Sequence, residues 1–90
     1  MAIKIQIPAP LRQHTEGLAY VEVAASSVKL ALDSLSSKYP ALTDRLMDNG
    51  KLRPFVNLFV NDEDIRYLDG PETALNEHDT VSIIPAVAGG

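Results

Sequence analysis

The residues with the clearest chemical potential are the two glycines that end the sequence, Gly89 and Gly90. Glycine has no Cβ, so a flexible segment that ends in glycine can pass through a narrow enzyme channel. The α-carboxylate of Gly90 is then an acyl group that an enzyme can activate. A terminal glycine pair alone is more typical of a frayed end. Directly after the last strand of a sheet, it indicates a reactive tail.

Other reactive side chains are scarce. The sequence has no cysteine, which excludes disulfides, thiolate metal sites and persulfide carriage. The two histidines, His14 and His78, have no partners at metal-ligand or triad spacing, so we expect both at the surface. The acidic run 62–64 lacks the ligand spacing of a calcium loop and predicts a solvated hairpin turn. We therefore expect no catalytic residue and no metal site in this chain.

The composition predicts one small globular domain. The 90 residues are 46% hydrophobic and 22% charged, the ordinary globular mixture. Twelve acidic and eight basic residues give a net charge of −4, which argues against nucleic-acid or anionic-membrane binding. No apolar run approaches the about 20 residues of a membrane span, and the first residues lack a signal-peptide layout. We expect a cytoplasmic protein that is a monomer on its own.

Hydrophobic periodicity predicts the elements that position the tail. Alternating apolar residues in 3–7 and 18–23 predict two strands joined through a glycine-containing loop. Ser26 or Ser27 is the expected N-cap of a helix that ends before Pro40. The apolar stripe of this helix consists of Val28, Leu32, Leu35 and Tyr39.

The second half of the chain predicts three more strands. A further helical turn at 42–46 is expected to close at Asn49-Gly50. Strands are expected at 55–60, 65–68 and 80–84, with Leu75 anchoring a short turn or 3₁₀ segment before the last one.

This order predicts an α+β fold. One main helix must cover one face of a mixed sheet of about five strands. If the first and last strands are parallel neighbours, the helix belongs to a crossover between them. That arrangement is the β-grasp, or ubiquitin-like, fold. We expect residues 1–85 to form this domain and residues 86–90 to form a flexible tail.

Strand alternation also predicts an exposed docking face. Phe55, Phe59 and Ile84 should point away from the helix and, with Pro85, form an apolar surface for a partner. A register error of one residue would reverse this assignment. Arg12, Arg53 and Arg66 are candidates for its rim. The residues expected to face the helix are Ile3, Ile5, Ile7, Val56, Leu58, Val60, Val81 and Ile83.

With this order and tail, the sequence resembles the ThiS/MoaD family of ubiquitin-like sulfur carriers over its whole length. The family motif is a last strand that runs through a proline to Gly-Gly, here residues 81–90, preceded by an acidic turn at Asp79. Segments 45–48, 55–57, 60–64 and 86–90 are similar to the carriers of thiocarboxylate-dependent cysteine biosynthesis. Molybdopterin-synthase subunits typically carry a proline where Ala86 stands, and thiamine-pathway carriers are shorter.

The resemblance implies a chemistry for the tail. An E1-like enzyme would use ATP and Mg²⁺ to adenylate the Gly90 carboxylate, and a sulfur donor would displace AMP to leave a thiocarboxylate. Val87, Ala88 and Gly89 would thread the tail into each enzyme. The expected acceptor is a PLP-dependent cysteine synthase, after which a metalloprotease regenerates the tail. The chain itself would bind no cofactor and would not be an enzyme.

Several other functions remain open at this point. The sulfur could instead serve molybdopterin, thiamine or a sulfur-containing natural product. The same activated C-terminus could form isopeptide bonds, as in a ubiquitin-like modifier. A plain β-grasp interaction domain would make the glycines incidental.

Overall fold

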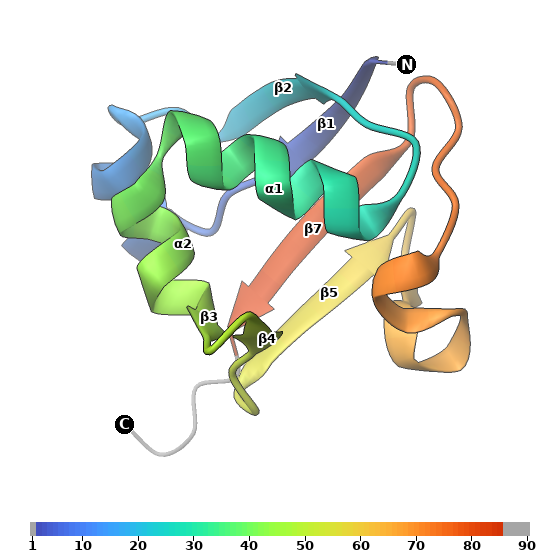
Figure 1. Ribbon diagram of the computed structural model, residues 1–90. Coiled ribbons are helices and arrows are strands. Elements are labelled where there is room, and N and C mark those ends of the chain that lie inside the picture. Colours follow the sequence, from blue (N-terminus) through green and yellow to red (C-terminus); the bar gives the residue numbers. More distant parts are fainter. Residues whose placement is uncertain (1, 86–90) are drawn as a thin grey trace.

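The computed structural model describes residues 2–85 and contains a mixed five-stranded sheet with helices on one face (Figure 1). The spatial order of the sheet is β2-β1-β7-β5-β6. Its strands are β1 (Ala2–Gln6), β2 (Tyr20–Ala24), β5 (Val56–Val60), β6 (Glu63–Asp64) and β7 (Thr80–Pro85). The short β3 (Met47–Asp48) and β4 (Lys51–Leu52) form a separate hairpin. The helices are α1 (Val28–Lys38) and α2 (Pro40–Leu46), with 3₁₀ segments η1 (Ala9–Thr15), η2 (Ile65–Tyr67) and η3 (Gly70–Glu72).

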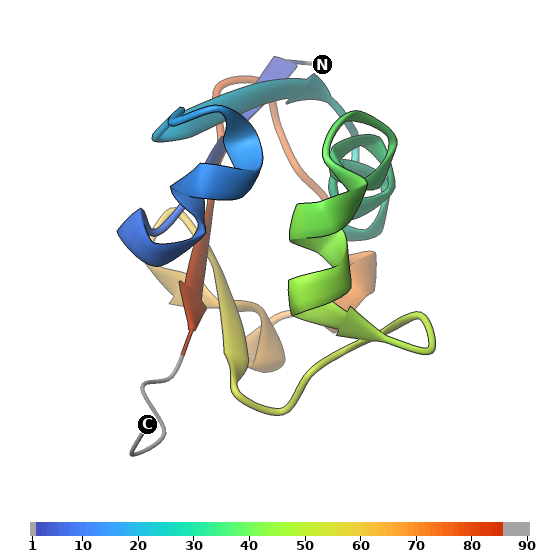
Figure 2. The same cartoon turned by 90° about the vertical axis from the view of Figure 1, so that its left-hand side faces the viewer.

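The first and last strands of the chain are neighbours in the middle of the sheet. β1 and β7 are parallel neighbours, with Lys4 opposite Thr80 and Gln6 opposite Ser82. The remaining pairs of this sheet are antiparallel. Both α1 and α2 lie on the same side of β7 (Figures 1 and 2). This topology is the β-grasp fold, as the element order predicted.

Local chemistry explains where α1 begins and ends. The Ser27 hydroxyl accepts a hydrogen bond from the Leu30 backbone N–H at 3.2 Å, so Ser27 is the N-cap. The helix ends at Lys38 because Tyr39 precedes Pro40, and proline disfavours the helical conformation of the residue before it. Pro40 then takes the first position of α2, where its missing N–H has no cost.

One predicted helix end is instead a hairpin turn. α2 ends at Leu46 and runs directly into β3, and Asn49 and Gly50 connect β3 to β4. Their φ angles, 53° and 78°, are those of the two central residues of a type I′ turn. The predicted closure of the helix at Asn49-Gly50 was therefore wrong, because the same left-handed conformation serves both a helix cap and a tight hairpin.

The predicted strand at 65–68 is also wrong. The return strand is β6, only two residues long, and η2 follows it. Asn61 and Asp62 turn the chain with φ angles of 49° and 83°. The Asp64 carboxylate then accepts the Arg66 backbone N–H at 2.8 Å, which favours a 3₁₀ turn over further pairing.

The core confirms the predicted strand register. All eight residues expected to face the helix are buried, and so are Val28, Leu32 and Leu35 of α1. Leu75 is buried as well and anchors the connection to β7. Tyr39 is only half-buried and packs at the edge of this cluster.

Candidate docking face at the end of the last strand

The central strand β7 leads toward the predicted reactive tail. Val87, Ala88, Gly89 and Gly90 lie outside the described residues, so the structure places the site as far as Pro85. Pro85 pairs with Val56 of β5, whereas pairing with β1 stops at Ser82. The last residues of β7 are therefore flanked by a strand on one side only.

The start of β7 is held by the acidic turn. The Asp79 carboxylate accepts hydrogen bonds from the Asn61 side-chain amide and the Asn76 backbone N–H, both at 2.8 Å. The Asn61 side-chain oxygen in turn accepts the Thr80 N–H at 3.0 Å. These bonds join the β5–β6 turn to the first residue of β7 and fix the strand that precedes the tail.

Of the four predicted docking residues, Ile84 and Phe59 lie on the face away from the helices, and Phe55 is in the turn before β5. Ile84 is 45% exposed and Phe55 is 43% exposed, while Phe59 is half-buried. Ser82 opposes Phe59 and Ile84 opposes Asn57, so Ile84 and Phe59 are diagonal neighbours on one face. Pro85 is half-buried, and strand alternation places it on the helix-facing side of β7, opposite to Ile84.

A polar row, which the sequence did not single out, lies beside this apolar pair. The Ser82 hydroxyl donates to the Gln6 side-chain oxygen at 2.9 Å across the β1–β7 junction. Tyr20 opposes Gln6 from β2, so hydroxyl and amide groups line the face next to Phe59. The strand alternation was the available signal for these residues.

A cleft of about 330 Å³ lies at the β1–β7 junction beside the end of β7. Arg12 of η1 borders it, and the Arg12 Nε donates to the Ile7 carbonyl at 3.0 Å. The residues that line the cleft are Gln6, Ile7, Pro8, Arg12, Asp62, Ser82, Ile83, Ile84 and Pro85.

The other two candidate rim arginines have partners elsewhere. Arg66 forms an ion pair with Asp64, with a shortest N–O distance of 2.6 Å, and Arg53 donates to the Asp44 carbonyl at 3.1 Å. Hydrogen bonds from the Arg66 side chain and backbone hold the pKa of Asp64 below its usual value. The same side-chain bond raises the pKa of Arg66. Both arginines border a second cleft, on the β5–β6 side.

The histidines differ from each other. His78 is 86% exposed, as predicted. His14 is half-buried, and its Nε2 is shielded without a hydrogen-bond partner, so His14 lies only partly at the surface. Within residues 2–85, no group of three or more histidine, aspartate or glutamate side chains is placed to hold a metal ion.

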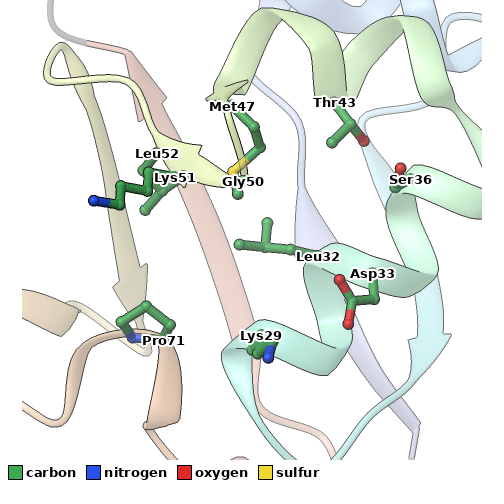
Figure 3. A pocket seen from close by; sticks show the side chains of 10 residues that line it. All are labelled: Lys29, Leu32, Asp33, Ser36, Thr43, Met47, Gly50, Lys51, Leu52 and Pro71. Carbon is green, nitrogen blue, oxygen red and sulfur yellow. The ribbon is translucent and has the colours of Figure 1, made fainter.

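A larger cleft than these two lies elsewhere, on the helical side (Figure 3). This cleft of about 550 Å³ separates α1 from the β3–β4 hairpin. Figure 3 shows Leu32 on one side and Met47 with Leu52 on the other, with Lys29, Asp33 and Lys51 around them. Sequence reasoning missed this cleft because the hairpin that forms its wall was predicted as a helix end.

Neither α1 nor α2 has the length and apolar character that a membrane-spanning helix requires, and no other helix in residues 2–85 does.

A β-grasp domain whose central last strand runs toward a Gly-Gly end belongs to the ubiquitin-like class of proteins. Within that class, the chain belongs to the ThiS family, which matches residues 5–90.

Three relatives show how far the similarity extends. Sulfur carrier protein CysO of Mycobacterium tuberculosis is 42% identical over 93 residues, covering all of both chains. A chain in the crystal structure of the Amycolatopsis orientalis BexX/CysO complex superposes with a TM-score of 0.90 at 40% identity, covering 98% of this chain and 99% of that one. Small archaeal modifier protein 1 of Methanosarcina acetivorans superposes with a TM-score of 0.89 at 32% identity, covering 99% and 96%.

Proposed function

We propose that this protein is a sulfur carrier that holds sulfur as a thiocarboxylate on Gly90 and delivers it for cysteine synthesis. The observation that carries the proposal is the full-length similarity to CysO, a sulfur carrier protein. The central position of β7 supports it, since that strand precedes the Gly-Gly end. The absence of cysteine is consistent with carriage on a carboxylate, because no thiol in the chain can hold a persulfide.

The proposed chemistry takes place on the tail inside partner enzymes. The Gly90 carboxylate attacks the α-phosphorus of ATP on an E1-like enzyme, forming an acyl adenylate and releasing pyrophosphate. A sulfur nucleophile then attacks the acyl carbon, and AMP leaves. ATP and Mg²⁺ belong to the activating enzyme and PLP to the acceptor synthase. This chain supplies the acyl group and the surface that docks, and it acts as a co-substrate.

The docking face supplies the recognition that this scheme needs. Ile84 lies six residues before Gly90, so a partner that covers Ile84 and Phe59 is near the start of the tail. The BexX/CysO complex of A. orientalis shows that a similar protein assembles with a partner. We extend this to an activating enzyme, an acceptor synthase and a processing metalloprotease for this chain. Molybdopterin, thiamine and natural-product pathways are the alternative acceptors.

The test is the intact mass of the protein after incubation with ATP, Mg²⁺, a family E1-like enzyme and sulfide. We expect a gain equal to sulfur replacing oxygen, mapped to Gly90 by fragmentation. A variant that lacks Gly89 and Gly90 is the control and should show no gain. An unchanged mass for the full chain with several such enzymes would contradict the proposal.

A second candidate is a protein modifier that forms isopeptide bonds with lysine side chains. The similarity to small archaeal modifier protein 1 favours it. In cell extract with ATP, a modifier yields covalent conjugates that resist thiols and disappear when Gly90 is deleted. A carrier yields the thiocarboxylate without such conjugates.

A further inference from the structure

Arg12 differs from the other arginines of the predicted rim. Arg66 is paired with Asp64 and Arg53 with a backbone carbonyl on the β5 side of the domain. Arg12 instead borders the cleft that contains Ile84 and Pro85. Its position is set by the Nε bond to the Ile7 carbonyl, which leaves the two terminal nitrogens of the guanidinium for another group.

Within residues 2–85, the cleft has a cation without an ion-pair partner at the end near Pro85. No carboxylate within residues 2–85 lies at ion-pair distance from Arg12. The one acid in the lining is Asp62, in the β5–β6 turn. The neighbouring Asn61 N–H donates to the Thr80 carbonyl, so this turn lies at the start of β7. β1 and β7 run in the same direction. Pro8 and Arg12 come after the end of β1, so they lie toward the end of β7, away from Asp62 at its start. The cleft is therefore acidic at one end and basic at the other.

The basic end also offers apolar surface. Pro8, Ile84 and Pro85 line the same cleft as Arg12. A half-buried guanidinium beside such surface binds a carboxylate in a fixed bidentate geometry better than a lysine does.

We propose that this cleft receives a segment of the E1-like activating enzyme in which a carboxylate side chain lies next to an apolar side chain. The carboxylate pairs with the Arg12 guanidinium, and the apolar side chain packs on Ile84. Asp62 disfavours binding of the segment in the reverse direction, because the partner's carboxylate would then lie next to the Asp62 carboxylate. This inference rests on the proposed function, because that function supplies the partner.

The experiment measures the affinity of the full-length chain for the purified E1-like enzyme at low and high NaCl. We expect Arg12→Glu to weaken binding by about tenfold at low salt, since a charge pair becomes a repulsion. Arg12→Lys should lose less affinity than Arg12→Glu. The matched control is Arg45→Glu on α2, an exposed arginine away from the cleft, which makes the same charge change and should stay within about twofold.

A fold defect must be separated from a lost contact. Arg12→Gln keeps an N–H donor near the Ile7 carbonyl but removes the charge and the terminal nitrogens of the guanidinium, so its melting should match the wild type while its affinity falls. Equal affinity of Arg12→Glu and wild type at low salt would overturn the inference. So would equal losses for Arg12→Glu and Arg45→Glu. The thiocarboxylate assay is independent: a wild-type chain that binds through Arg12 but never gains sulfur would contradict the proposed function alone.

Discussion

Asp64 is a buried carboxylate, 8% exposed, whose side-chain hydrogen bonds all come from Arg66. Its oxygens accept hydrogen bonds from the Arg66 backbone N–H and guanidinium, at 2.6 to 3.2 Å. These bonds lower the pKa of Asp64. A lowered pKa in the folded state adds stability above the unfolded value of about 3.9. That contribution is lost as the pH falls through the folded pKa.

We therefore predict that Asp64→Asn reduces the dependence of the free energy of unfolding on pH in the acid range. The variant should be less stable than wild type at pH 7, with a gap that narrows as the pH falls below about 4. Urea denaturation at a series of pH values measures this. The control is Asp33→Asn on α1, an exposed aspartate whose curve should run parallel to wild type. A parallel curve for Asp64→Asn would show that the pair has no linkage to folding.

Gly89 is the residue whose size should matter most for the proposed activation. We predict that Gly89→Leu slows adenylation by about 100-fold, because a side chain in a narrow channel displaces the reacting carboxylate. Pyrophosphate release by the E1-like enzyme measures this, and Ala41→Leu on the exposed side of α2 is the control. Melting should be unchanged, and normal adenylation kinetics for Gly89→Leu would contradict the threading role.

At the level of the elements, alternate residues of β5 and β7 face the core and the proposed docking face. Ile84 points outward and Leu58, 1% exposed, points into the core. We predict that the free energy of unfolding of Ile84→Asp lies within about 1 kcal/mol of the wild-type value. The variant should bind the partner enzyme at least about tenfold more weakly. Leu58→Asp should lose more than about 4 kcal/mol, because it buries an unpaired charge. Phe59→Asp, at a half-buried position, should fall between them in stability.

Urea denaturation and a binding titration together check this prediction. A loss of stability for Ile84→Asp as large as that for Leu58→Asp would mean that Ile84 belongs to the core.

At the scale of the whole molecule, the core and the proposed docking face lie on opposite sides of one sheet. Leu35 of α1 is fully buried against the inner face, and its truncation to alanine leaves a cavity. We predict a loss of about 2–5 kcal/mol in the free energy of unfolding. Affinity for the partner enzyme, measured well below the melting temperature, should stay within about twofold of wild type. A large loss of affinity in the folded variant would show that helix packing shapes the docking face.

The alternation in 3–7, 55–60 and 80–84 was enough to predict which side chains are buried, since each strand residue reports its own face. The two errors have local causes that sequence patterns share between structures. Asn49-Gly50 suits both a helix end and a hairpin turn. The run 65–68 is apolar enough for a strand, but the Asp64 side chain competes for the backbone N–H groups that follow it.

The amino-acid sequence alone predicted the β-grasp order and the outward position of Ile84, because these depend on residue type and short-range spacing. The sulfur chemistry of the tail came from the family resemblance and stays a prediction. It could not distinguish Arg12 from Arg53 and Arg66, because only the tertiary structure places Arg12 in one cleft with Ile84 and Pro85. Gln6 and Ser82 are 76 residues apart, and only the parallel pairing of β1 with β7 places them in contact. The same pairing brings the segment after β1 beside the end of β7, and so creates the cleft that Ile84 and Pro85 line.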